Sequence, residues 1–311
     1  MKTTNKLKAK LGYGILILLF ASLFAFKKED AQFRCFPLKE EVCTIPQGEA
    51  GAVVIEFKSP PKSVAASFWH KPISFRPDPN CRRDWTGFLP ADLRMAPGEY
   101  LLHITTIENS GEETEFLLPI TIEEKKYVVE ELTLDPEMVN LKPEALKRVV
   151  KDNQILIGAM SDFTHTLYWE GAFIAPVPGE VTSPYGMQRI INNVPKSPHN
   201  GVDLSAAEGD EIQATNTGKV SIVYEGYLTG KTVIVDHGGG LYSVYFHLSE
   251  PKVQTGDLVN KGDVIGLVGA TGMVTGPHLH FSIRLGKSYI DPQSFLAVAA
   301  EAERAREKLE K

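Results

Sequence analysis

The segment Gly276-Pro277-His278-Leu279-His280-Phe281-Ser282-Ile283-Arg284-Leu285 decides the fold of the C-terminal half of this 311-residue chain. Apolar residues occupy every second position from Leu279 to Leu285, an alternation that predicts a β-strand with one face in a core. Gly276-Pro277 is a turn signal, so the strand is expected to begin just after it. The two histidines therefore share the face opposite Leu279.

A second segment, His199-Asn200-Gly201-Val202-Asp203, carries related chemistry. Asn200-Gly201 favours a tight turn, so we expect His199 at the end of a loop and Asp203 on a strand over residues 202–204. A catalytic zinc ion typically takes three protein nitrogen or oxygen ligands and leaves one position to water. Two histidines and one aspartate meet that count, so the two segments together predict a zinc site.

The residues around these segments are typical of an antiparallel β domain. Short apolar runs separated by glycine, asparagine and aspartate turns predict a partly closed sheet with a groove across one face. The predicted strands include residues 219–224, 232–235, 242–248 and 264–268. Gly238 to Gly240 mark a tight hairpin because glycine tolerates positive φ. We expect Asp236 and His237 to be residues of that turn.

Several motifs between Ser183 and Phe295 resemble, in the same order, those of the M23 family of zinc metallopeptidases, the LytM-like and lysostaphin-like peptidoglycan hydrolases. The matching motifs are Ser183-Pro184-Tyr185-Gly186, His199 to Asp203, Tyr245-Phe246-His247-Leu248, Val259 to Gly266, and Thr275 to Phe281. The resemblance implies a β-rich fold whose groove holds an extended peptide.

The resemblance also implies a role for each of five residues. It makes His199, Asp203 and His280 the ligands of one Zn²⁺ per chain, and His247 and His278 the unliganded catalytic histidines. We expect His278 to act as general base and His247 to stabilise the transition state, because imidazole titrates near neutrality and can both accept and donate a proton. The two histidines could also exchange or share these duties.

Two further residues are candidate substrate contacts. By strand alternation Tyr245 shares a face with His247, so its hydroxyl could orient that histidine or bind substrate. Arg189 is expected on a loop at one end of the groove, where its guanidinium suits a substrate carboxylate. The alternatives are an exposed arginine with no substrate and, for His247, a buried histidine with a purely structural hydrogen bond.

The rest of the chain divides into an N-terminal domain, a linker and a tail. Strand-like runs between proline and glycine turns predict an immunoglobulin-like β-sandwich over residues 31–125, so the protein is expected to be mainly β. Its predicted strands are residues 53–57, 63–69, 100–105 and 115–122. Residues 126–172 form a linker with a helix from Pro143 to about Met160, since proline suits a first helical turn. The peptidase-like domain follows at residues 173–296, and residues 297–311 predict a charged, solvated helix.

The first 30 residues predict export. Four lysines precede an uncharged apolar stretch over residues 11–26, which is the pattern of a secretion signal. A membrane-spanning helix needs about 17 to 25 residues, so the stretch could instead stay as an N-terminal membrane anchor. We therefore expect the protein in the periplasm or cell envelope. There, two of the three cysteines (Cys35, Cys43 and Cys81) could form a disulfide, the alternative being three buried free thiols.

Charge and motifs together indicate the class of function. A net charge of −6 argues against a nucleic-acid partner. We expect a zinc endopeptidase that acts on the peptide stems or cross-bridges of peptidoglycan, in an oligomeric state that the sequence does not reveal. Two alternatives are a non-catalytic envelope protein that binds peptidoglycan or activates another hydrolase, and an endopeptidase that acts on a secreted protein.

Overall fold

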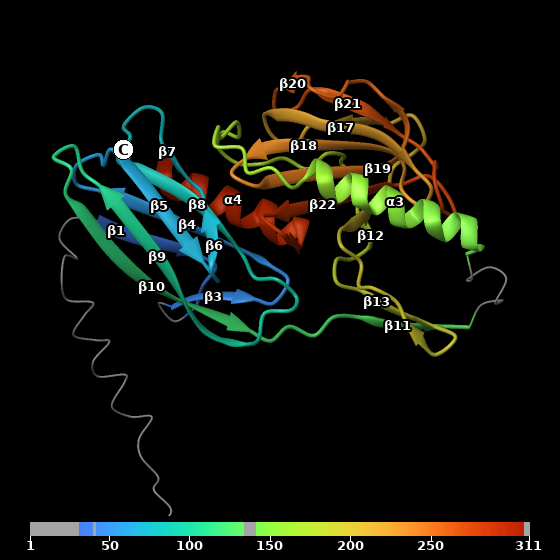
Figure 1. Cartoon of the computed structure of the whole chain (residues 1–311), viewed down its shortest axis with the longest axis horizontal. Coiled ribbons are helices and arrows are strands. Elements are labelled where there is room, and N and C mark those ends of the chain that lie inside the picture. The colour runs from blue at the N-terminus through green and yellow to red at the C-terminus, as the bar shows by residue number, and fades with distance from the viewer. Residues whose placement is uncertain (1–30, 40–41, 134–140, 308–311) are drawn as a thin grey trace, which may run out of the picture.

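The structure is a computed structural model that describes residues 31–39, 42–133 and 141–307. Strands are the main regular structure of these residues, with two long helices alongside them (Figure 1). The predicted secretion signal, residues 1–30, lies outside the described residues. Within the ranges that the structure covers, no helix is long and apolar enough to cross a membrane.

Two sheets form the N-terminal part of the molecule. The first has the strand order β1 (Ala31–Phe36), β4 (Ala50–Phe57), β8 (Asp84–Pro90), β7 (Phe75–Pro77). The second has the order β2 (Leu38–Lys39), β3 (Val42–Pro46), β10 (Glu113–Glu123), β9 (Gly98–Ile107), β5 (Ser63–Phe68), β6 (Lys71–Ile73). All four strands predicted here are confirmed. All pairings are antiparallel except that of β3 with β10.

The two N-terminal sheets pack against each other through aromatic and aliphatic side chains. Phe33 and Phe57 of the first sheet contact Phe116 of the second, with ring centroids 5.3 and 6.5 Å apart. Ile104 and Ile120 are almost completely buried in the same core. The predicted two-sheet layering agrees with this packing, whereas the immunoglobulin-like topology stays a prediction.

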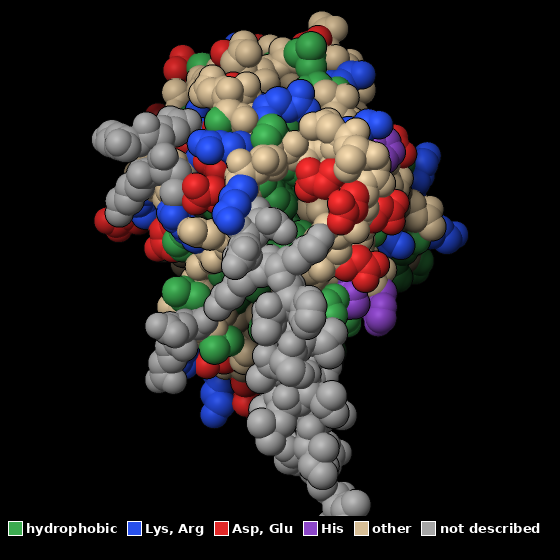
Figure 2. Space-filling model, turned by 90° about the vertical axis from the view of Figure 1, so that its left-hand side faces the viewer, with side chains coloured by type: hydrophobic (Ala, Val, Ile, Leu, Met, Phe, Trp, Pro, Cys, Tyr) green, Lys and Arg blue, Asp and Glu red, His purple; other side chains and the backbone are tan. Residues whose placement is uncertain are grey.

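Figure 2 shows this end of the molecule, where basic and acidic side chains lie interspersed.

A ten-stranded sheet dominates the C-terminal part. Its main path is β12 (Val181–Ser183), β15 (Val202–Leu204), β22 (Leu279–Leu285), β19 (Leu241–Pro251), β18 (Gly230–Gly238), β17 (Gly218–Gly226), β20 (Leu258–Val259). Off this path, β16 (Glu211–Gln213) pairs with β21 (Val264–Val268), β21 also pairs with β19, and β23 (Ser288–Ile290) pairs with β22. Every pairing in this sheet is antiparallel, so the predicted antiparallel domain and its strands are confirmed.

The segment between the two parts contributes a strand and a helix. Strand β11 (Val129–Leu132) pairs in parallel with β13 (Gln188–Ile191), which also pairs with β14 (Val194–Pro195). Helix α3 (Pro143–Ala159) begins with proline in its first turn, as predicted. Leu156 of α3, with Met160 just beyond it, packs on side chains of β18 and β19, so the helix lies on one face of the large sheet (Figure 1).

The C-terminal helix α4 (Pro292–Glu307) is not a solvated tail, and that prediction is wrong. The helix begins five residues earlier than expected, and its apolar side chains Phe295, Val298, Ala299 and Ala302 are buried. These residues recur every three or four positions and form one apolar stripe among many charges. The stripe contains two alanines, which is why the charged residues dominated the sequence pattern.

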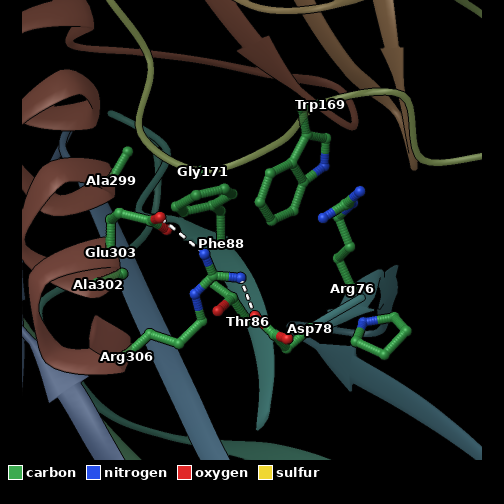
Figure 3. A pocket seen from close by; sticks show the side chains of 11 residues that line it. Arg76, Asp78, Thr86, Phe88, Trp169, Gly171, Ala299, Ala302, Glu303 and Arg306 are labelled. Carbon is green, nitrogen blue, oxygen red and sulfur yellow. Dashed lines mark hydrogen bonds and ion pairs between the residues drawn. The ribbon is translucent and has the colours of Figure 1, made fainter. Parts of the chain in front are cut away.

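Helix α4 joins the two parts of the molecule through one continuous core. Phe295 contacts Phe88 of the N-terminal strand β8 and Phe173 of the C-terminal part, at ring-centroid distances of 5.0 and 4.8 Å. At the end of the helix, Arg306 pairs with the buried carboxylate of Asp78 and lies 2.7 Å from Glu303 (Figure 3). The first N-terminal sheet, through β4 and β8, therefore shares a core with the sheet that carries the candidate site.

Candidate metal centre

Strand register brings the two predicted metal-binding segments together. In the antiparallel pair of β15 and β22, Asp203 lies directly opposite His280. Leu279 is fully buried on the other face, as the alternation predicted. The loop that carries His199 is held by backbone hydrogen bonds between His199 and both Gly186 and Met187. The three predicted ligands therefore meet where β15, β22 and the loop before β15 come together.

Gly201 allows this close approach. A Cβ atom at Gly201 would lie 2.4 Å from the carbonyl oxygen of Phe281 and 2.8 Å from Nε2 of His280. Any larger residue would push the β15 segment away from β22. The Asn-Gly turn signal thus marks a position where the backbone must pass next to a ligand.

Three potential ligand atoms converge in this space. Nε2 of His199 lies 3.0 Å from Nδ1 of His280 and 3.2 Å from Oδ1 of Asp203. Nδ1 of His280 lies 2.9 Å from the same carboxylate oxygen. Two ligands bound at about 2.0–2.1 Å to a tetrahedral ion stand about 3.3 Å apart. The spacing therefore fits a small tetrahedral metal ion after minor adjustment.

The outer nitrogens of the two histidines prepare the inner ones to bind metal. Nδ1 of His199 lies 3.0 Å from the carbonyl oxygen of Pro184, which can only accept a hydrogen bond. Nδ1 therefore carries the proton in the neutral ring, and Nε2 presents a lone pair to the site. Nε2 of His280 lies 2.8 Å from Oγ of Ser282, which can accept its proton in the same way. The donor set fits zinc.

Electrostatics keep the aspartate ionised. Burial acts to raise the pKa of Asp203. An inner nitrogen of His199 or His280 that does carry a proton donates it to this carboxylate, and these contacts outweigh burial and hold the pKa of Asp203 well below its usual range. Burial also lowers the pKa of His280, so its ring is neutral at pH 7. One carboxylate and neutral imidazoles are the protonation states that bind a divalent cation.

His278 lies at the edge of this triad without joining it. Its Nε2 is 3.8 Å from Oδ1 of Asp203, on the same side of the strand as His280. Its Nδ1 is 2.9 Å from the carbonyl oxygen of Gly276, so Nδ1 carries the proton in the neutral ring. Nε2 is then a free base that faces the site.

His247 completes the group of four histidines. Its ring centroid lies 4.9 Å from that of His278 and 6.2 Å from that of His280. The carbonyl oxygen of Thr271 accepts a 2.9 Å hydrogen bond from Nδ1, and burial lowers the pKa of His247 to about 4. At neutral pH the ring is uncharged, so its Nε2 also presents a lone pair.

Strand alternation misplaced Tyr245. His247 has φ of +67°, and the pairing of β18 with β19 shifts register between Lys231 and Val233. The two irregularities turn His247 toward the face of Phe246, whose ring stacks on His280 at 5.0 Å. Tyr245 points the other way, fully buried, and its hydroxyl accepts a hydrogen bond from the backbone of Thr215. Its predicted contact with substrate is therefore wrong.

Arg189 lies on strand β13 rather than on the predicted loop. Its Nε is 3.0 Å from Oε2 of Glu130 on the neighbouring strand β11, and both side chains are partly exposed. The guanidinium therefore already has a carboxylate partner within the protein. A role in binding the carboxylate of a substrate stays a prediction.

His237 also differs from expectation. It is a completely buried residue of β18, with Nδ1 2.8 Å from the carbonyl oxygen of Thr217 and Nε2 2.8 Å from Oγ of Ser243. Burial lowers its pKa to about 4. It is a structural histidine, but the prediction that Asp236 and His237 belong to the turn is wrong, because β18 continues to Gly238.

The sequence patterns did not single out two residues that shape the site. Phe246 packs flat on His280, and Ser282 holds its outer nitrogen. Both follow from strand geometry. Ser282 is two positions after His280 on one strand, and Phe246 lies opposite His280 on β19.

Comparison with known proteins agrees with this geometry. The model of peptidase family M23 matches residues 197–292, a range that contains all five residues of the candidate centre. The chain carries a peptidase family M23 domain. The M23 domain includes β15 to β23 and ends at the first residue of α4.

Curated relatives match about a third of the chain. The peptidoglycan DD-endopeptidase ShyB of Vibrio cholerae is 37% identical over 94 residues, which is 30% of this chain and 22% of ShyB. The DD-carboxypeptidase/endopeptidase Mpg of Neisseria meningitidis is 35% identical over 96 residues, 31% of this chain and 22% of Mpg. The matched region therefore spans about a fifth of the length of these relatives.

One solved structure resembles most of the chain. A Pseudomonas aeruginosa protein solved as a peptidase M23 superposes with a TM-score of 0.62 at 28% identity, covering 84% of this chain and 97% of the other. The likeness therefore extends beyond the M23 domain into the N-terminal sheets.

Proposed function

We propose that this protein is a zinc-dependent endopeptidase that hydrolyses peptide stems or cross-bridges of peptidoglycan in the cell envelope. The observation that carries the proposal is the convergence of His199, Asp203 and His280, with His278 and His247 beside them, inside an M23 domain. The name of ShyB, a peptidoglycan DD-endopeptidase, supports peptidoglycan as substrate.

Each residue of the centre has a task in amide hydrolysis. Bound zinc would supply an acidified water and a Lewis acid for the scissile carbonyl. His199, Asp203 and His280 would hold one Zn²⁺ per chain. Asp203 offsets part of the metal charge, and Pro184 and Ser282 keep the two imidazoles in the tautomers that bind.

The two remaining histidines would handle the protons. His278 is assigned as general base, because its Nε2 is unprotonated and lies 3.8 Å from Oδ1 of Asp203. His247 becomes a hydrogen-bond donor at Nε2 only after it takes a proton, and in that form it would stabilise the developing oxyanion. The proton that leaves the attacking water can thus return to the departing amine by way of this pair.

Zinc content and point variants test the ligand assignment. His280→Ala should lose stoichiometric zinc and activity together, because it removes one of three ligands. His237→Gln is the matched control, since it alters a buried histidine outside the centre and should keep one zinc per chain. Tight zinc binding by His280→Ala would contradict the assignment.

Kinetics of His278→Ala test the division of roles. This variant should keep its zinc but lose about 10²- to 10⁴-fold in rate, the usual contribution of general acid–base assistance. Normal turnover would remove His278 from the mechanism. If His247→Ala shows the larger loss, the two histidines exchange roles.

Digestion of purified peptidoglycan by the protein without residues 1–30, followed by mass spectrometry, tests the substrate. New amine termini within the peptide portion would identify an endopeptidase and its bond. Intact peptidoglycan from a zinc-loaded protein would contradict the proposed substrate.

The proposal places the protein outside the cytoplasm. Peptidoglycan lies in the envelope, and residues 1–30 carry the sequence pattern of an export signal whose apolar stretch, residues 11–26, could also anchor the protein to the membrane. Fractionation of cells and N-terminal sequencing of the mature protein distinguish a cleaved signal from a retained anchor.

A further inference from the structure

Helix α3 places one buried carboxylate against the M23 sheet. Asp152 is 3% exposed and lies above the hairpin of β17 and β18. Its Oδ2 accepts a 2.7 Å hydrogen bond from the backbone N–H of Tyr227, in the turn of that hairpin. Its Oδ1 accepts hydrogen bonds from the hydroxyl of Tyr224 at 2.7 Å and from Nε of Arg148 at 2.6 Å. The carboxylate therefore fixes the hairpin from outside the sheet.

The same turn holds the chain segments of both unliganded histidines. The carbonyl oxygen of Thr229 accepts a 2.9 Å hydrogen bond from the backbone N–H of His247. The carbonyl oxygen of Leu228 accepts a 3.0 Å hydrogen bond from the backbone N–H of Met273, in the loop that leads to His278. Three consecutive residues of the turn are thus bound, one by Asp152 and two by the histidine segments.

His247 needs this support more than an ordinary strand residue does. Its φ of +67° lies in the left-handed region, which a side chain with a Cβ rarely adopts. The hydrogen bond to Thr229 is made at this residue, and the one from Nδ1 to Thr271 orients its ring. Thr271 is in turn tied to the start of β18, since its Oγ1 accepts a hydrogen bond from the backbone of Lys231 at 2.9 Å.

We infer that Asp152 is a positioning residue for His247, acting through the β17–β18 turn, and that helix α3 is therefore a working part of the peptidase rather than a spacer. The inference rests on the proposed function for the meaning of His247. The effect on conformation does not depend on the reaction: without the acceptor at Asp152, the turn no longer holds His247 in its left-handed conformation.

Three variants of α3 separate positioning from general stability. Asp152→Ala removes the acceptor for the Tyr227 N–H. Asp152→Asn is the conservative variant, because its carbonyl oxygen can still accept that hydrogen bond while exposed Arg148 turns to water. Leu156→Ala is the matched control, since it removes a buried side chain from the same helix and sheet contact without touching the turn.

The expected results differ among the three. Asp152→Ala should lower kcat about 10- to 100-fold with little change in KM, since small misplacements of catalytic groups cost about that much. Asp152→Asn should keep most of the rate, and Leu156→Ala should lower stability but not kcat. All three should keep one zinc per chain, because Asp152 and Leu156 contact none of the ligands.

Hydrogen exchange of single amides gives a readout that does not depend on activity. In zinc-loaded Asp152→Ala, the amides of His247 and Met273 should lose protection, whereas the amide of Gly239, which is bound to Thr164, should not. Unchanged protection of His247, or an equal loss of kcat in Leu156→Ala, overturns the inference. Peptidoglycan left intact by the wild type would count against the proposed function only, because the exchange experiment still decides the role of Asp152.

Discussion

Replacement of Ser282 by alanine is expected to weaken zinc binding without removing a ligand. Ser282 is 1% exposed, and its Oγ lies 2.8 Å from Nε2 of His280. In the alanine variant no other partner of His280 Nε2 is at hand among the residues that the structure describes, so the proton would move to Nδ1 and be donated to Asp203, 2.9 Å away. Zinc would then have to displace that proton before it could bind.

The size of the effect follows from the role of such outer partners. Their loss typically lowers metal affinity about 10- to 100-fold. That range corresponds to about 1.4 to 2.7 kcal/mol of binding free energy. We therefore expect the dissociation constant of Ser282→Ala for zinc to rise by this factor at neutral pH. Because the proton only moves between the two nitrogens of a neutral ring, the factor should stay constant as pH rises further.

A competitive titration against a chromophoric chelator measures the dissociation constant of each variant. Ser243→Ala is the control, because Ser243 makes a bond of the same length to the buried His237, on the same sheet but away from the centre. Both variants lose one buried serine–histidine hydrogen bond, so both should be destabilised by about 1 to 3 kcal/mol. Zinc affinity within twofold of wild type in Ser282→Ala, or an equal weakening in Ser243→Ala, would refute the reasoning.

Three other predictions concern the body of the protein. Burial lowers the pKa of His237 in the folded state from 6.5 to about 4. As pH falls below 6.5 the unfolded chain therefore takes up a proton at His237 before the folded protein does, and the free energy of unfolding decreases. Urea unfolding of metal-free protein should show about 3 kcal/mol less stability at pH 4 than at pH 7 from this group, and this loss should be absent in His237→Gln. Phe295→Ala should cost about 3 to 5 kcal/mol and lower the urea midpoints of the N-terminal and C-terminal sheets together, whereas a shift confined to one sheet would contradict the shared core. All three thiols are free in the structure, but the hydrogen bond that the Cys43 thiol donates to Cys35 raises the pKa of Cys43, and both lie in one core while Cys81 does not; peptide mapping of protein kept under oxidising conditions should therefore find a Cys35–Cys43 link, and any link through Cys81 would exclude this pairing.

Sequence patterns were sufficient where a residue's position depends on regular strand geometry. The alternation after His278 placed Leu279 in the core, and the Asn-Gly signal placed Asp203 on a short strand, which lies opposite His280 in the structure. The resemblance to M23 peptidases added the pairing of these segments, which no local pattern contains. The strands around the centre were predicted for the same reason, since each has an apolar face bounded by turn residues.

Predictions failed where the backbone leaves regular geometry or where a face is covered by a distant element. The left-handed conformation of His247 reverses the alternation that placed Tyr245 beside it. The apolar stripe of α4 is narrow because two of its members are alanines, and its partner Phe88 lies about 200 positions earlier in the chain, a separation at which local pattern carries no information. The role of Asp152 depends on the same kind of distant contact.

The position of α4 also sets an order of events during synthesis. The apolar surface formed by Ala50, Ala52, Val54 and Phe88 is only partly covered until residues 292–302 exist. Trp169 and Phe173 pack on Phe88, but Phe295 of α4 supplies a further part of the matching surface. At about 5–20 residues per second, the interval is about 10 to 40 s. If synthesis stops before Pro292, the N-terminal sheets can form but part of their apolar surface stays exposed to water. Chaperones and quality-control proteases recognise exposed apolar surface of this kind.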